Sequence, residues 1–224
     1  MNGFSKILIA TGICFSTASV FAADKPYTNG GGGGTEEVVS TYYARLRPLN
    51  SRVTGWVRFR LRGDEFNTQL TAMRAAPSIM HIAHIHAGTR CPTMAADKNK
   101  DGYVDVIEGL PDYGAILVPL DGDLSSQDAG HASSPVANAK GRIRYTQTTS
   151  YSAMLSDLHA MDPNPNDAIV KLKTGEELRL TDRHVVVHGV ASSTVLPSTV
   201  QSLPGAPAQA TLPIACGQIY QVQK

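Results

Sequence analysis

The sequence is poor in the features that mark several large classes of protein. Charged residues make up 17% of the 224 residues, the formal net charge is +1, and no basic run stands out. Nucleic acid is therefore not an expected partner. No segment after the N-terminal one is apolar enough to span a membrane, and there is no internal repeat. These absences leave a non-repetitive globular chain whose function is sought in local motifs.

Residues 1–22 predict a secretory signal peptide. Lys6 supplies the positive start, residues 7–20 form an apolar run that is short for a bilayer span, and Ala22 ends a small-residue cleavage pattern. A retained anchor helix is the alternative interpretation. Removal of this segment would place the mature protein in the periplasm or outside the cell, with no membrane span left in it.

The remaining chain predicts one domain that is rich in β-strands. Residues 23–35 include five consecutive glycines and predict a flexible lead, so the domain is assigned to residues 36–224. Within residues 53–63, apolar residues alternate with three arginines, which is typical of a sheet with one solvated face. Short helices are predicted at 151–161 and 165–175. Further strands are predicted at 38–49, 79–88, 114–122, 141–149, 183–190 and 210–222. Together, these short strands favour an antiparallel sandwich or barrel with long loops.

Two of the three cysteines, Cys91 and Cys216, remain after the predicted signal peptide. An even pair in an oxidising compartment predicts a disulfide. It would close a loop of about 125 residues and contribute about 3–5 kcal/mol by limiting the unfolded chain. Two thiols that stay free or bind a metal are the alternative.

Three histidines within six residues, His81, His84 and His86, raise the question of a metal site. On a strand His84 and His86 point to the same face, within reach of one ion, and imidazole suits copper and zinc. Such a pair by itself is a weak signal, because many strands carry one without a metal. His184 and His188 also lie on one face, but they are about 13 Å apart on a strand and cannot share an ion.

Four segments together resemble the copper/zinc superoxide dismutase family. That family has a motif H-G-F-H-V-H, a cysteine downstream, a segment G-R-x-x-V-V-H and a terminal strand L-A-C-G-x-I. In this chain they correspond, in the same order, to HIAHIH at 81–86, Cys91, DRHVVVHG at 182–189 and IACGQI at 214–219. The resemblance implies a flattened Greek-key β-barrel, in agreement with the strand pattern, and an intramolecular disulfide from Cys91 to Cys216.

The resemblance also implies roles for the matched site residues. His84, His86 and His188 match three copper ligands. His81 matches a histidine close to the site that is not itself a ligand, and Arg183 matches an arginine just before the ligand-bearing strand.

The chain departs from the family at places that matter for activity. The family has a fourth copper histidine that bridges to zinc, followed by a loop with two more histidines and an aspartate. The only histidines in this chain between Cys91 and Arg183 are His131 and His159. His131 is the candidate for a fourth copper ligand, His159 is interpreted as structural, and no zinc site is expected. An arginine that attracts the anionic substrate in the family is replaced by Pro213, which offers neither charge nor a hydrogen-bond donor.

The segment DKNKDGYVDVIE at 97–108 satisfies the calcium-loop pattern D-x-[DN]-x-[DN]-G-x5-E. It predicts a single calcium loop that orders the chain after Cys91, because Gly109 and Pro111 should end any exit helix quickly. An acidic surface turn that binds nothing is the alternative. The predicted oxygen ligands are Asp97, Asn99, Asp101, the Tyr103 carbonyl, Asp105 and Glu108.

These motifs predict an exported, superoxide dismutase-like protein with a histidine copper site and a calcium-stabilised loop. As an enzyme, it would use copper to exchange electrons with superoxide. The missing zinc ligands and Pro213 favour a second hypothesis, a copper-binding protein with little turnover. A structural domain of the cell envelope with vestigial histidines is the third.

Overall fold

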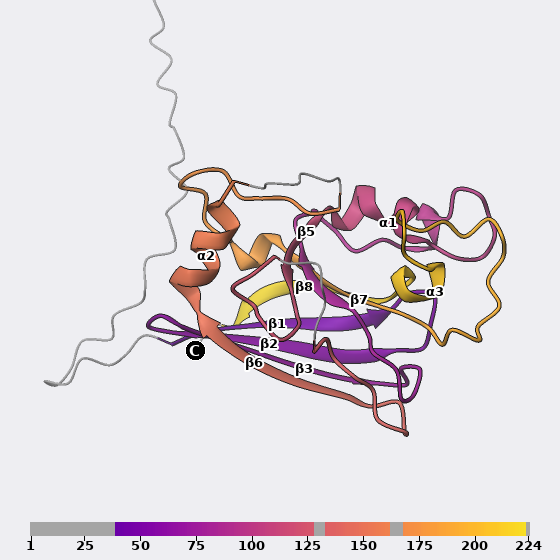
Figure 1. Ribbon diagram of the computed structural model, residues 1–224, viewed down its shortest axis with the longest axis horizontal. Helices are drawn as coiled ribbons and strands as arrows, with labels where there is room; N and C mark the ends of the chain where they lie inside the picture. Colours follow the sequence, from indigo (N-terminus) through magenta and orange to yellow (C-terminus); the bar gives the residue numbers. More distant parts are fainter. Residues whose placement is uncertain (1–38, 128–132, 162–167, 223–224) are drawn as a thin grey trace, which may run out of the picture. The chain divides into compact units, whose positions relative to one another are not determined.

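The computed structural model describes residues 39–127, 133–161 and 168–222. The predicted signal peptide, the glycine-rich lead and His131 lie outside the described residues. The described part is mostly β: eight strands form one antiparallel sheet that curls into a half-barrel, with few helices (Figure 1).

The strands are not arranged in chain order. Their order across the sheet is β5-β4-β7-β8-β1-β2-β3-β6, so that only the β1–β2–β3 meander and the β4–β5 and β7–β8 pairs join neighbours in sequence. The bounds are β1 Val39–Pro48, β2 Thr54–Arg62, β3 Glu65–Met73, β4 Ala83–His86, β5 Ile116–Pro119, β6 Ile143–Ser150, β7 His184–His188 and β8 Pro213–Val222.

Short helices occupy the connections between the strands. They are η1 Met94–Ala96, α1 Val106–Tyr113, α2 Tyr151–His159, η2 Leu180–Asp182 and α3 Ala208–Thr211. None of the helices in the described part of the chain is long and apolar enough to cross a membrane.

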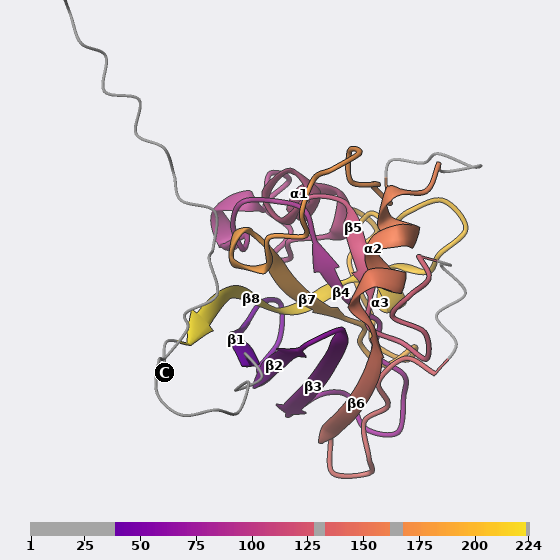
Figure 2. The same ribbon diagram turned by 90° about the vertical axis from the view of Figure 1, so that its left-hand side faces the viewer.

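The core lies on the inner face of the curled sheet. Figure 2 shows β1, β2, β3 and β6 on one side of the curl and β4, β5 and β7 on the other. Alternation along the strands decides which residues point inward: Val57 and Phe59 of β2 are fully buried, while Arg58 and Arg60 between and after them point outward. Phe59 stacks on Phe66 of β3 with ring centroids 5.7 Å apart.

Cys91 and Cys216 are joined in a disulfide, with Cα atoms 5.7 Å apart. Cys91 follows β4 in the chain and Cys216 lies in β8, so the bond fastens the loop after β4 to the C-terminal strand. The pairing is the one that the sequence predicted.

Several predicted elements are confirmed and others are corrected. The strands predicted at 38–49, 53–63 and 210–222 are present, and the 151–161 segment forms α2. Residues 168–175, the described part of the second predicted helix, are not helical, and β3 was not predicted. The exit helix after the acidic loop does not end quickly: α1 makes two turns, with Pro111 inside it.

Candidate metal centre

Two adjacent strands bring three of the predicted ligands together. His84 and His86 lie two residues apart on β4, and His188 ends the antiparallel neighbour β7. Ile85 and Val187, on the alternate positions, belong to the inner core, so the three imidazoles project from the outer face of the sheet. One ligand atom from each lies within 4.8 Å of the others, and the ring centroids are 5.3–5.8 Å apart.

The triad is shielded from solvent. The three histidines are each no more than 4% exposed. The ring of Tyr113, at the end of α1, lies edge-on to His86 and His188 at centroid distances of 4.8 and 6.3 Å. The Tyr113 hydroxyl donates a hydrogen bond to the Val106 carbonyl at 3.0 Å, within the same helix. The Tyr113 ring therefore covers the triad with an apolar surface, and the hydrogen bond of its hydroxyl group holds the ring in place.

Backbone carbonyls orient two of the rings. His86 Nδ1 is 2.8 Å from the Gly114 carbonyl, and His188 Nδ1 is 2.7 Å from the Thr211 carbonyl. Since carbonyls only accept, each Nδ1 is the protonated nitrogen and each Nε2 carries the lone pair that can bind a metal. The Nε2 atom of His86 is buried and has no hydrogen-bond partner among the described residues.

Burial keeps the His86 ring neutral. Burial, together with the nearby His188, lowers the pKa of His86 to about 3. A histidine binds a metal through the neutral imidazole, so this environment favours the ligand form at neutral pH.

Two further histidines near these strands, His81 and His184, lie outside the group of three. The ring nitrogens of His81 face the carbonyls of His188 and Ala76, at 3.2 and 2.9 Å. His81 thus supports the backbone that carries His188, as the resemblance implied for a non-ligand neighbour. His184 directs Nδ1 to the Gly88 carbonyl at 3.2 Å and lies outside the group of three.

Neither Arg183 nor Pro213, the residue at the family's substrate-attracting position, offers a free positive charge at the triad. The Arg183 guanidinium donates to the carbonyls of Leu178 and Ala87, at 2.8 and 3.3 Å, so its role here is to fix loops. Pro213 is buried and lies opposite His188 in the β7–β8 register. His159, at the end of α2, donates from Nε2 to the Glu176 carbonyl at 2.7 Å, which agrees with a structural role.

The acidic loop at 97–108 uses its carboxylates to bind its own backbone. Asp97 accepts hydrogen bonds from the N–H groups of Asp101 and Gly102, and Glu108 accepts from those of Lys98 and Asn99. Gly102 has φ 91°, a conformation that favours glycine, at the position where the pattern requires it.

Two further carboxylates of the loop bind outside it. Asp105 caps α1 in a reciprocal capping box with Glu108, and its second oxygen accepts from the Gln201 N–H at 2.7 Å. Asp101 accepts from the Thr199 hydroxyl at 2.7 Å. Within the described ranges, the three histidines are the only group of three metal-binding side chains with ligand atoms within 4.8 Å of one another. The calcium ligand set therefore stays a prediction.

Helix α1 connects the acidic loop to the triad. It begins at the Asp105 cap and ends at Tyr113, and Gly114 then supplies the carbonyl that orients His86. Gly114 has φ 75°, and a Cβ there would lie 2.4 Å from the Gly88 nitrogen. Tyr113, Gly114 and Thr211 were not predicted from the sequence as parts of the site, because none of them lies in a motif.

Comparison with known proteins does not extend this description. No family model matches the chain, and a search of curated proteins finds no match. The geometry and chemistry of the site therefore carry the functional argument.

Proposed function

We propose that the chain is a copper-binding protein of superoxide dismutase-like architecture, with His84, His86 and His188 as the copper ligands. The observation that carries the proposal is the convergence of three buried imidazoles, from two strands, with ligand atoms within 4.8 Å of one another. Nitrogens that share an ion at about 2.0–2.1 Å each lie within about 4 Å of one another, so the triad needs at most a small closure. The Nε2 atom of His86 is buried and has no hydrogen-bond partner among the described residues, and its lone pair could bind the ion.

The surrounding residues prepare the triad for a metal. The carbonyls of Gly114 and Thr211 fix the orientation of two rings, and Tyr113 excludes water from one side. Copper bound there would supply one-electron oxidation and reduction. An all-imidazole donor set suits either copper or zinc, and the resemblance to the dismutase copper motif favours copper.

The topology supports the dismutase-like architecture. The pairs β3–β6, β4–β7 and β8–β1 join strands that are distant in sequence, which requires long connections across the ends of the sheet, as in Greek-key arrangements. The disulfide between the loop after β4 and the terminal strand is the one that the resemblance implies.

Copper binding is favoured over rapid dismutation of superoxide. Fast turnover of a small anion depends on cationic side chains that steer it and on an open metal position. Arg183 is bound to backbone carbonyls, Pro213 is uncharged, and the triad is shielded. The predicted export, to the periplasm or beyond, would place such a protein where copper enters the cell.

Copper titration of the full chain against a competing chelator tests the proposal. We expect one copper per chain, and a loss of affinity of at least about 100-fold in His188→Ala, since even an orienting partner is worth about 10–100-fold. His159→Ala, which removes a histidine outside the group of three, should leave the affinity unchanged. Equal affinity in both variants, or a higher affinity for zinc than for copper, would contradict the assignment.

A superoxide assay on the same samples separates two functions. No acceleration by the copper-loaded protein over free copper supports the binding role. Copper-dependent superoxide loss that disappears in His188→Ala would instead assign dismutation.

We also propose that the 97–108 loop binds calcium and that the ion orders the chain between Cys91 and α1. The complete sequence pattern and the Asp105–Glu108 capping box at the loop's exit support this assignment. Glu108→Gln in calcium and in chelator, described below, is its test.

A further inference from the structure

A shallow hollow of about 550 Å³ lies on the outer face of strands β8, β1 and β2. Its lining includes three aromatic and two arginine side chains, which are Tyr43, Arg45, Trp56, Arg58 and Tyr220. None of these residues belongs to the histidine triad or to the acidic loop. We name this surface the aromatic–arginine face.

The strand register assembles this face from residues that are distant in sequence. Tyr43 of β1 lies opposite Arg58 of β2 on one side and Tyr220 of β8 on the other, and Arg45 lies opposite Trp56. The Tyr43 ring centroid is 6.2 Å from that of Trp56 and 6.5 Å from that of Tyr220. The three rings therefore form one continuous apolar strip across three strands.

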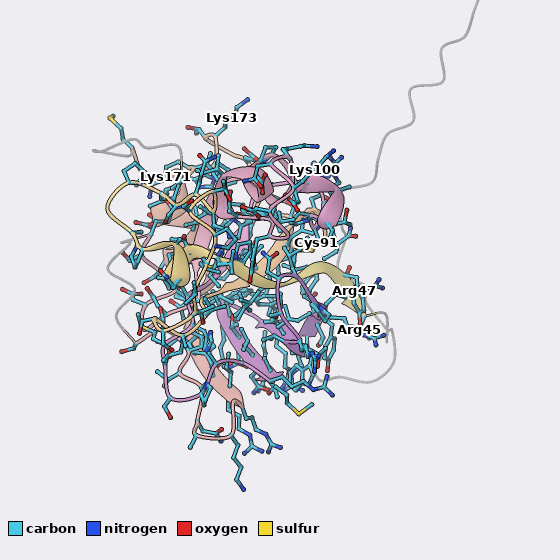
Figure 3. All side chains as sticks on the ribbon, turned by 90° about the vertical axis from the view of Figure 1, so that its right-hand side faces the viewer. Arg45, Arg47, Cys91, Lys100, Lys171 and Lys173 are labelled. Carbon is cyan, nitrogen blue, oxygen red and sulfur yellow. A yellow bond between two sulfur atoms is a disulfide. The ribbon has the colours of Figure 1, made fainter. Side chains whose placement is uncertain are left out.

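The face is positively charged although the net charge of the chain is only +1. Arg45 and Arg47 on β1 and Arg58 and Arg60 on β2 point outward, about 6.7 Å apart along each strand. Among the described residues, none of these four guanidinium groups takes part in an ion pair. Figure 3 shows Arg45 and Arg47 together, well apart from Lys171 and Lys173. Arg58, one of the arginines predicted to form a solvated face, thus lines the hollow together with Arg45.

The Arg58 side chain lines the hollow, and not all of its hydrogen-bond donors have partners among the described residues. One terminal nitrogen donates to Gln69 Oε1 at 2.5 Å, while its Nε–H is buried with no hydrogen-bond partner in the described part of the chain. Arg58 places guanidinium donors beside apolar rings, which favours an acceptor ligand that also has an apolar surface.

We propose that the aromatic–arginine face binds an acidic polysaccharide. Guanidinium groups pair with carboxylate and sulfate in a bidentate manner, and the spacing of the arginines along the strands suits a chain with repeated charges. The electron-rich faces of the aromatic rings attract the polarised C–H groups of sugar rings. Nucleic acid is not favoured as the ligand, because the chain as a whole carries a net charge of only +1. Because Trp56 is only 38% exposed, it does not project as a membrane anchor would.

Trp56 provides the readout, since it is the one tryptophan of the chain. Its fluorescence is followed while the full chain, without added copper, is titrated with polygalacturonate, heparin or neutral dextran. We expect a saturable change with at least one of the two acidic polymers, weakening as salt rises, and none with dextran. Arg45→Gln with Arg58→Gln should weaken binding at least tenfold, because two charge-assisted contacts are lost.

A matched double variant, Lys140→Gln with Lys173→Gln, removes the same charge from exposed residues elsewhere and should bind as the wild type does. Equal weakening in both double variants would show diffuse charge attraction and overturn the proposal. So would the absence of binding to either acidic polymer, or tighter binding to single-stranded DNA or phosphatidylglycerol vesicles. Unfolding temperatures of both double variants confirm that each is folded. None of these outcomes depends on the copper assignment.

Discussion

The sequence predicts a metal site both at the histidine triad and in the acidic loop, but the structure holds the side chains of the two regions in different ways. The triad residues come from strands whose backbone positions are fixed by the sheet, and their rings converge before any ion is added. The loop residues are consecutive in the chain, and their carboxylates bind backbone N–H groups and the 199–201 segment.

The difference shows what a rigid scaffold contributes to a site. Strand register holds the imidazoles in place, so ordering them for a metal costs little further conformational entropy. In the loop the carboxylate oxygens already accept backbone hydrogen bonds, so calcium has to share or displace contacts that exist without it. Four changes can break or sharpen this contrast.

The largest effect on metal binding is expected when a ligand of the rigid site is removed. His84→Ala should lower copper affinity at least about 100-fold, while calcium chelation should leave copper affinity within about threefold of the wild type. Competition titrations with and without calcium measure both values. A large dependence of copper affinity on calcium would show that the triad is not preassembled.

Loss of the disulfide should lower the free energy of unfolding more than it lowers metal affinity at either site. Cys91→Ser with Cys216→Ser frees a loop of 125 residues and should lower the free energy of unfolding by about 3–5 kcal/mol. Urea unfolding of the oxidised wild type and of the variant, both without metal, gives the difference. A change under 1 kcal/mol would mean that the sheet alone holds this loop.

Gly114→Ala tests the connection between α1 and the triad. The new Cβ would lie 2.4 Å from the Gly88 nitrogen at a φ of 75°, which should cost about 2–3 kcal/mol and move the carbonyl that orients His86. Copper affinity should fall about tenfold. Gly175→Ala is the matched control: it has φ 79° but nothing within 4 Å of its Cβ, so it should carry backbone strain alone. If both variants bind copper equally well, the Gly114 carbonyl does not position the ring.

The smallest effect is expected in the loop. Glu108→Gln removes one of the two carboxylate oxygens that accept backbone hydrogen bonds, so it should lower the melting temperature in both conditions, but more in calcium than in chelator. The additional loss in calcium should correspond to about 1–2 kcal/mol if calcium exceeds its Kd about tenfold. Glu177→Gln, on an exposed residue outside the loop, should shift neither value. Equal shifts of Glu108→Gln in both conditions would leave the loop as an acidic turn that binds nothing.

Much of the sheet and part of the site could be predicted from local sequence. Alternation along 53–63 predicted β2, and the i, i+2 spacing predicted that His84 and His86 share a face. β3 escaped notice because its inward positions include Thr68, so the apolar alternation is interrupted. Helix α1 passes through Pro111 because the capping box fixes its start and the tyrosine at its end is anchored over the triad.

The rest of the site depends on tertiary contacts that no local pattern encodes. That His188 joins the other two histidines depends on its placement at the end of β7, since the β4–β7 register pairs His86 with His184, and only the resemblance indicated it. Tyr113, Gly114 and Thr211 act through packing and a backbone carbonyl, which nearly any residue type can supply. The aromatic–arginine face likewise appears only when three strands are placed side by side.

The most direct test of the account is the metal content of the full chain, produced with its own N-terminal segment and purified without chelators. Elemental analysis should find about one copper per chain, and His188→Ala should carry none. Absence of copper from the wild type, even after reconstitution with Cu(I) or Cu(II), would contradict the account and reduce the triad to three buried histidines on an ordinary sheet.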